Sequence, residues 1–154
     1  MKLFLMRHGE AELAARNDSQ RCLTDSGCED VRQMAERHRQ ELAAVDALWV
    51  SPYVRAQQTA DIVSDVLGTL NSRETQPLLK PSSDPNAVFK ALEGKEQTLL
   101  LVTHQPLVGT LVDLLAGLEP GSHRLGTAAL ACIEADVMAR GCGELCWLHQ
   151  PTFN

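Results

Sequence analysis

Two histidines and two arginines each stand shortly after an apolar stretch of the sequence. Arg7 and His8 follow the first stretch, Arg55 follows the second, and His104 follows the third. An arginine binds two phosphate oxygens at once through its planar fork. A neutral histidine carries a lone pair that can attack phosphorus, and a second histidine can donate a hydrogen bond to the oxygens as charge develops. These residue types therefore predict phosphoryl transfer.

Residues beside the first and third segments extend this candidate site. Gly9 lacks a side chain, which lets the backbone approach a phosphate closely. Gln105 precedes a helix that is expected to begin near residue 106, where free amides and the helix dipole favour an anion. His8 must be neutral to attack, so a partner must hold its other ring nitrogen. We expect a backbone carbonyl in the Gly9 region to do this.

Four further polar residues have two open interpretations each. Arg21 lies in a polar loop and could reach a phosphate or be solvated. Asp18 could pair with Arg21 or face solvent. Thr127 could line the pocket or cap a structural element, and Glu10 could orient an arginine or be an exposed carboxylate.

Alternating strands and helices would bring the three segments together. In open α/β sheets, ligands bind at the carboxyl ends of the strands, so the segments are expected at one sheet edge. The pattern predicts one domain over residues 1–154, an α/β three-layer αβα sandwich whose mostly parallel mixed sheet has an antiparallel edge. The expected strands are 2–6, 47–50, 98–102, 128–134 and 144–149. The expected helices are 26–43, 55–67, 86–92 and 106–115.

Local signals set several boundaries of these elements. Thr24, Asp25 and Ser26 offer N-cap oxygens for the first helix, and Gly68 is a plausible cap for the second. The prolines between residues 69 and 86 predict an irregular segment. His38 is expected to be packed or partly exposed, and His149 is expected to be incidental.

Bulk composition excludes several classes. The net charge of −6 over 154 residues disfavours nucleic-acid binding. No apolar run reaches membrane length, and the N-terminus does not resemble a signal peptide. The five cysteines are odd in number, which favours reduced thiols in the cytoplasm. The sequence contains no HxH, HExxH or CxxC pattern, so neither a metal nor another cofactor is expected.

Four motifs together resemble the histidine phosphatase superfamily, which includes phosphoglycerate mutases and acid phosphatases. The resemblance covers essentially the whole chain and implies a phosphoglycerate mutase-like fold. By this resemblance His8 would accept the phosphoryl group, and Arg7, Arg55 and His104 would bind it. The motifs are residues 5–10 (LMRHGE), 23–27 (LTDSG), 51–60 (SPYVRAQQTA) and 102–108 (VTHQPLV).

The chain resembles the SixA-type phosphohistidine phosphatases, which are the compact members of this superfamily. Its short length and the segments 21–24, 104–109 and 126–129 carry this resemblance. This similarity implies a phosphorylated protein substrate, such as a histidine-phosphotransfer domain of a phosphorelay. Larger relatives carry a general acid in a segment that is short here, where Glu74 and Asp84 are the stand-ins; Glu10 is a further candidate acid. A phosphohistidine leaves as an imidazole, which solvent can protonate beforehand, so the missing general acid fits a phosphohistidine substrate.

Several alternatives stay open at this level. The chain could be a small-molecule phosphomonoesterase or a mutase-like enzyme of the same superfamily. It could also be a non-catalytic phosphate-binding adaptor module, or a metal-dependent hydrolase. The expected form is a cytoplasmic monomer that binds neither nucleic acid nor membrane.

Overall fold

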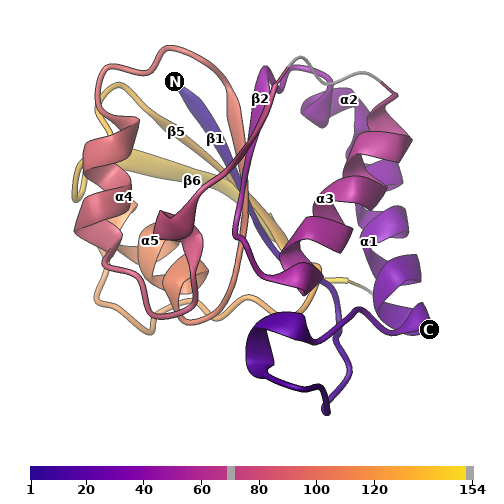
Figure 1. Ribbon diagram of the computed structural model, residues 1–154. Helices are drawn as coiled ribbons and strands as arrows, with labels where there is room; N and C mark the ends of the chain where they lie inside the picture. The colour runs from indigo at the N-terminus through magenta and orange to yellow at the C-terminus, as the bar shows by residue number, and fades with distance from the viewer. Residues whose placement is uncertain (69–71, 152–154) are drawn as a thin grey trace.

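A six-stranded mixed sheet forms the centre of the molecule in the computed structural model, which describes residues 1–68 and 72–151 (Figure 1). The strand order is β3-β2-β4-β1-β5-β6. The first four of these are parallel, whereas β5 is antiparallel to both β1 and β6. The predicted α/β architecture with an antiparallel edge is therefore confirmed. The strands are β1 (Lys2–Arg7), β2 (Ala47–Val50), β3 (Arg73–Thr75), β4 (Leu99–Thr103), β5 (Leu130–Ala135) and β6 (Gly143–His149).

Helices cover both faces of the sheet and complete the three layers. In Figure 1, α1, α2 and α3 lie on one side, and α4 and α5 lie on the other. Short 3-10 turns occur at Asp18–Gln20 and Pro77–Leu79. The helices are α1 (Asp25–Arg37), α2 (Arg39–Leu42), α3 (Val54–Leu67), α4 (Pro85–Leu92) and α5 (Leu107–Leu115).

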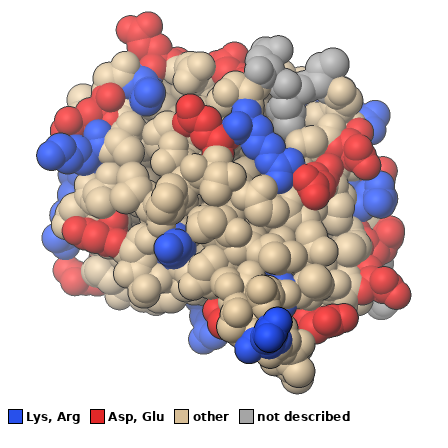
Figure 2. All heavy atoms as spheres, viewed as in Figure 1, with Lys and Arg blue, Asp and Glu red and all other residues tan. Residues whose placement is uncertain are grey.

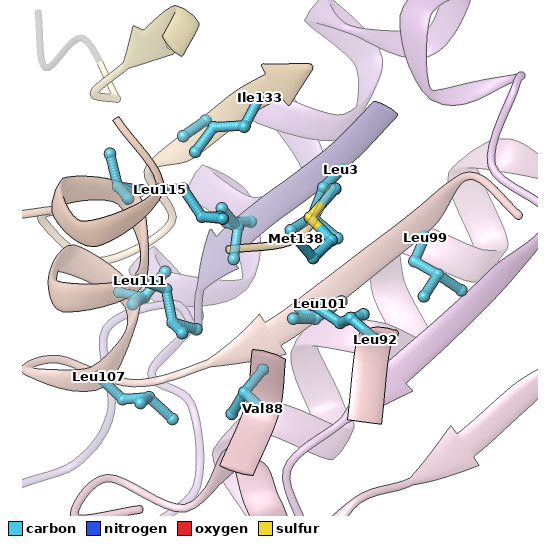
Figure 3. Close-up of a cluster of buried hydrophobic side chains, with 14 of the residues drawn as sticks. Leu3, Val88, Leu92, Leu99, Leu101, Leu107, Leu111, Leu115, Ile133 and Met138 are labelled. Carbon is cyan, nitrogen blue, oxygen red and sulfur yellow. The ribbon is translucent and has the colours of Figure 1, made fainter. Parts of the chain in front are cut away.

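Each face of the sheet has its own hydrophobic core. Successive strand side chains point to opposite faces, so Leu3 and Leu5 join the core under α4 and α5, while Phe4 and Met6 join the other. Figure 3 shows leucines of β1, β4, α4 and α5 meeting in the first core, which also contains Trp49. Burial on both faces explains why these strands are continuous apolar runs.

The expected single helix over residues 26–43 is wrong in one respect, because the chain breaks at His38 into α1 and α2. The His38 ring is buried and stacks on Trp147 of β6, with ring centroids 4.5 Å apart. Its Nε2 atom lies 3.0 Å from Nδ1 of His149. His38 is thus packed as predicted, but His149 is not incidental: it fastens β6 to the end of α1.

The expected irregular segment over residues 69–86 is also partly wrong. It contains β3, whose three residues are exposed and carry no apolar signal. Backbone pairing with β2 defines this edge strand, because Leu48 N–H donates to the Ser72 carbonyl and Gln76 N–H donates to the Val50 carbonyl. Residues 69–71 of the segment lie outside the described residues.

Several predicted helix signals are confirmed. The Thr24 side chain is the oxygen that caps α1, since it accepts from Gly27 N–H at 2.9 Å. Gly68 ends α3 with φ +83°, a conformation that favours glycine. The expected helix at 106–115 begins one residue later, at Leu107, after a cis Gln105–Pro106 bond.

Gly9 and Gly27 allow the loop after β1 to lie directly on α1. A Cβ atom at Gly27 would overlap the Glu10 carbonyl oxygen, and one at Gly9 would lie 2.8 Å from the Gly27 oxygen. Both contacts involve backbone atoms, which cannot move away by a change of side-chain rotamer. This contact fixes the chain that carries His8 against the first turn of α1.

Replacing Gly27 with Ala is expected to destabilise the protein by about 1–3 kcal/mol, as overpacking does. At an exposed helix position, replacing glycine with alanine would stabilise the protein by up to about 1 kcal/mol. A decrease in the free energy of unfolding would therefore indicate that the added Cβ atom overlaps the Glu10 backbone. Urea unfolding gives the measurement. The matched control is Ser26→Ala on the exposed side of the same turn, expected to change stability by less than about 0.5 kcal/mol. A stabilised Gly27→Ala protein would contradict the close approach.

Candidate active site

The four core candidates converge on one cavity of about 330 Å³. Arg7 ends β1 and His8 follows it, Arg55 lies in the first turn of α3 after β2, and His104 directly follows β4. Because β1, β2 and β4 are parallel, their carboxyl ends meet at one edge of the sheet. The sequence prediction that the three segments share this edge is confirmed.

The His8 ring is held in one tautomer by hydrogen bonds at both nitrogens. Nδ1 donates to the Gly9 carbonyl oxygen at 2.7 Å, as the sequence analysis expected. Nε2 is therefore the nitrogen with the lone pair, and it accepts from Nε of Arg55 at 3.2 Å. Burial, reinforced by Arg55, Arg7 and Arg21, lowers the pKa of His8 to about 3. The ring is thus a neutral base at physiological pH, with its nucleophilic nitrogen toward the cavity.

Asp18 holds Arg55 in place against His8. Nη1 of Arg55 donates to the Asp18 carbonyl oxygen at 2.6 Å, and Nη2 donates to its carboxylate at 3.2 Å. The same carboxylate accepts from Nε of Arg21 at 2.9 Å. Although partial burial acts to raise the pKa of Asp18, hydrogen bonds from Arg21 and Arg55 hold it below its ordinary value. The open question of Asp18 is answered: it joins two arginines.

The His104 ring lines the cavity and is hydrogen-bonded to Ser51. Its Nε2 lies 2.7 Å from the Ser51 hydroxyl, which already accepts from the Tyr53 amide. When the Ser51 hydroxyl donates to Nε2, the ring proton resides on Nδ1, and this tautomer can donate to a phosphoryl oxygen. Within the described chain this buried Nδ1 has no partner. Burial, with His8 and Arg55 nearby, lowers the pKa of His104 to about 3, so the ring is neutral as well.

Like His104, Arg7 has a buried side-chain nitrogen without a hydrogen-bond partner in the described chain. Its Nη1 donates to the Leu125 carbonyl at 3.0 Å, whereas its Nε is buried and unpartnered among the described residues. Burial and the nearby Arg124, Arg55 and Arg21 lower the pKa of Arg7. Buried donors normally have partners. A tetrahedral oxyanion in the cavity would supply acceptors for Arg7 and His104 together.

Of the other candidate site residues, four line the cavity and Gly9 does not. Glu10, Arg21, Gln105 and Thr127 line the cavity. The Gln105 side chain also has a structural task, since Oε1 accepts from Gly109 N–H at 2.9 Å. Gly9 is not among the residues that line the cavity, and its lack of a side chain permits the close contact with α1.

The stand-in acids lie outside the cavity. Glu74 is exposed on edge strand β3, where it accepts from Gln76 at 3.0 Å. Asp84 caps α4 by accepting from Asn86 N–H. Glu10 is the one candidate acid that lines the cavity, and its carboxylate accepts from the Thr24 hydroxyl.

Sequence reasoning did not assign roles to several residues that support the site. The Ser51 hydroxyl is hydrogen-bonded to Nε2 of His104, and the Tyr53 ring packs edge-on against His104 with 5.0 Å between centroids. The Arg55 guanidinium also lies over the Tyr53 ring at 5.0 Å. Thr59 accepts from Gly9 N–H at 3.1 Å and so ties the nucleophile loop to α3. All three residues lie in the 51–60 motif, which was the available signal.

Acidification is expected to destabilise the protein because both site histidines have a pKa of about 3 in place of 6.5. Between these values the unfolded chain binds protons that the folded site rejects. Stability is therefore full above pH 6.5 and falls as the pH drops toward 3, by about 1.4 kcal/mol per pH unit for each histidine. Urea unfolding from pH 7 to pH 5 measures the slope.

His104→Gln serves as the comparison, because it removes one of the two titrating rings. Its unfolding free energy is expected to fall less steeply with acidification than that of the wild type, by about 1.4 kcal/mol per pH unit. Equal slopes for the two proteins would show that His104 titrates normally in the folded state.

Two surveys of the described residues complete the geometry. No helix in residues 1–68 and 72–151 is both long and apolar enough to cross a membrane. In the same part of the chain, no three His, Cys, Asp or Glu side chains cluster closely enough to hold a metal ion. The five cysteines are free.

Comparison with known proteins gives one consistent result. The model of the histidine phosphatase superfamily (branch 1) matches residues 3–80. The chain is 36% identical to the phosphohistidine phosphatase SixA of Escherichia coli strain K12, over 98% of this chain and 94% of that protein. It is 35% identical to a SixA homolog of Haemophilus influenzae, over 76% and 78% of the two chains. A solved structure of the protein histidine phosphatase SixA complexed with tungstate superposes with a TM-score of 0.89, at 36% identity, over 98% of this chain and 97% of that one.

Proposed function

The chain belongs to the histidine phosphatase superfamily, and from this membership we propose that it is a protein phosphohistidine phosphatase with His8 as its nucleophile. The observation that carries the proposal is the His8 ring, neutral and held by Gly9 so that Nε2 faces a cavity with three arginines. Likeness to SixA over nearly the whole chain supports phosphohistidine as the substrate. The SixA complex with tungstate, a tetrahedral oxyanion like phosphate, supports an oxyanion site.

In the first step, Nε2 of His8 attacks the phosphorus atom. A new N–P bond forms on His8 while the N–P bond to the substrate histidine breaks, and the departing imidazole takes its proton from solvent. Arg7, Arg55 and Nδ1–H of His104 hold the phosphoryl oxygens as charge shifts between the two nitrogens. Arg55 must release its hydrogen bond to His8, which frees the lone pair for attack.

In the second step, water attacks the phosphorylated His8. The oxygen of water forms the new P–O bond, the N–P bond breaks, and inorganic phosphate leaves. Nε2 recovers its lone pair, and the Nδ1 hydrogen bond to Gly9 is unchanged throughout. The same three donors stabilise both transition states, because the phosphoryl group occupies one position in both steps.

The positions of the candidate general acids support phosphohistidine over a phosphomonoester as substrate. An alkoxide leaving group gains about 10²–10⁴-fold from a general acid, whereas an imidazole can be protonated beforehand. Glu74 and Asp84 do not line the cavity, and the Asp18 carboxylate, which does, is engaged by two arginines. Glu10 is therefore the carboxyl group that could act as an acid. The proposal extends to a histidine-phosphotransfer domain as partner, to a monomer, and to a cytoplasmic location, which the free cysteines favour.

A substrate comparison tests the proposal. A histidine-phosphotransfer protein carrying phosphohistidine is expected to be hydrolysed with a kcat/KM at least about 10²-fold above that for phosphoglycerate or p-nitrophenyl phosphate. Equal or greater activity on the two phosphomonoesters would favour the small-molecule enzyme instead.

Glu10 is the observation that would favour that second candidate, because its carboxylate lines the cavity. A general acid at Glu10 predicts that Glu10→Gln slows phosphomonoester hydrolysis by about 10²-fold or more. Phosphohistidine hydrolysis should change by less than about tenfold in the same variant.

A further inference from the structure

A second cavity of about 540 Å³ adjoins the active site. Arg7 and Gln105 line both cavities and form the wall between them. The remaining lining residues are Pro106, Gly121, His123 and Arg124, from the start of α5 and the loop before β5. The mechanism above uses none of these four residues.

His123 is fixed at this cavity by a carboxylate from the protein interior. Asp113 of α5 is fully buried, and its Oδ1 lies 2.7 Å from Nδ1 of His123. Its Oδ2 accepts from the amides of Gly121 and His123 at 3.0 and 3.1 Å. A buried carboxylate is costly unless it is fully hydrogen-bonded. Here three hydrogen bonds, from the Gly121 amide, the His123 amide and Nδ1 of His123, satisfy the Asp113 carboxylate and hold the loop before β5. Nε2 of His123 has no hydrogen-bond partner in the described chain.

The lining of this cavity is one-sided in charge. Two arginines line it, and none of the residues that line it is acidic. The chain as a whole has a net charge of −6, and acidic and basic side chains are interspersed over the face shown in Figure 2. Arg124 also lies close enough to Arg7 to contribute to its lowered pKa. Cations gathered without a carboxylate opposite them favour an anionic ligand.

We propose that this second cavity binds a carboxylate side chain of the phosphoprotein substrate, beside the phosphohistidine in the active site. Arg124 would contact the carboxylate, and His123, whose Nδ1–H is held by Asp113, would donate to it from Nε2 when the ring carries both protons. Arg7 separates this carboxylate from the phosphoryl group. Because the two cavities share a wall, one protein surface can occupy both. The inference rests on the proposed function and adds a requirement to it: the preferred partner carries Asp or Glu next to its phosphohistidine.

Two peptides test this subsite directly. Both carry one histidine phosphorylated with phosphoramidate, and they differ only in having Glu or Gln at the positions flanking it. Wild-type protein is expected to hydrolyse the Glu peptide with a kcat/KM about tenfold higher, mainly through KM. The preference should shrink toward one as salt is raised, since exposed charges are screened.

Variants assign the preference to named residues. Arg124→Ala and His123→Gln are each expected to reduce the ratio from about ten to below three, while hydrolysis of phosphoramidate itself stays within twofold of wild type. Arg140→Ala, an exposed arginine that lines neither cavity, should keep the full ratio. A reduced ratio in Arg124→Ala with the unfolding midpoint unchanged supports the subsite.

The failures are distinguishable. Equal hydrolysis of the two peptides by wild-type protein overturns the subsite and leaves the phosphohistidine phosphatase proposal standing. A Glu preference that survives in both Arg124→Ala and His123→Gln also overturns it. Hydrolysis of neither peptide and no hydrolysis of phosphoramidate overturns the proposed function, and the subsite with it.

Discussion

Replacing His8 with Ala is expected to lower kcat/KM for phosphohistidine protein by about 10⁴- to 10⁶-fold, the scale found when a nucleophile is removed. Without Nε2 no covalent intermediate can form, and the remaining donors can only bind the phosphoryl group. The measurement is phosphate release under single-turnover conditions. His149→Ala is the matched control, because His149 does not line the cavity and its loss should leave turnover within a fewfold of wild type.

The same variant separates an enzyme from a phosphate-binding adaptor. Wild-type protein quenched rapidly during turnover should carry acid-labile phosphate on His8, located by mass spectrometry, and the His8→Ala protein should carry none. Turnover that survives in His8→Ala would refute covalent catalysis at this residue. Phosphate found on a different residue would move the nucleophile there.

Replacing Arg55 with Ala is expected to lower kcat/KM by about 10²–10³-fold, the usual cost of removing one transition-state donor. The effect should exceed simple charge loss, because the Arg55 guanidinium contacts His8, the Asp18 carbonyl and the Asp18 carboxylate through three different nitrogens. The variant therefore loses a phosphate ligand and the link that connects the Asp18 loop to the nucleophile.

Arg55→Lys separates charge from geometry. Lysine keeps the charge but lacks the planar fork, so activity should remain at least tenfold below wild type. Arg73→Ala is the control, since Arg73 pairs with Asp61 at the exposed edge of the sheet, and it should leave kcat/KM unchanged. Full activity in Arg55→Lys would show that only the charge at this position matters.

The convergence of His8, Arg55 and His104 was predictable because parallel strands end at one edge of a sheet. Apolar runs identified those strands, and the residues after each run carried the chemistry. The partner of the His8 ring was predictable for a similar reason: a backbone carbonyl must lie near the turn at Gly9. These inferences required only local pattern and one topological rule.

What the sequence could not show depends on contacts between distant residues. The break in the first helix coincides with the stacking of His38 on Trp147, which comes more than a hundred residues later. Edge strand β3 is exposed on all three residues, so it has no hydrophobic pattern to detect. The packing of Gly9 against Gly27 could not be read from the sequence, because it depends on how α1 lies against the loop after β1. The sequence suggested Arg21 as a partner of Asp18 but gave no local sign that Arg55 would share its carboxylate.

The two tryptophans of the chain lie on opposite faces of the sheet. Trp49 is buried in the core beneath α4 and α5, whereas Trp147 stacks against both His38 and His149, which also stack on each other, on the side of α1. Each face of the sheet thus has its own fluorophore. In variants that keep only one tryptophan, fluorescence would report the refolding of each face of the sheet separately. The emission of Trp147 would record when β6 packs against the end of α1.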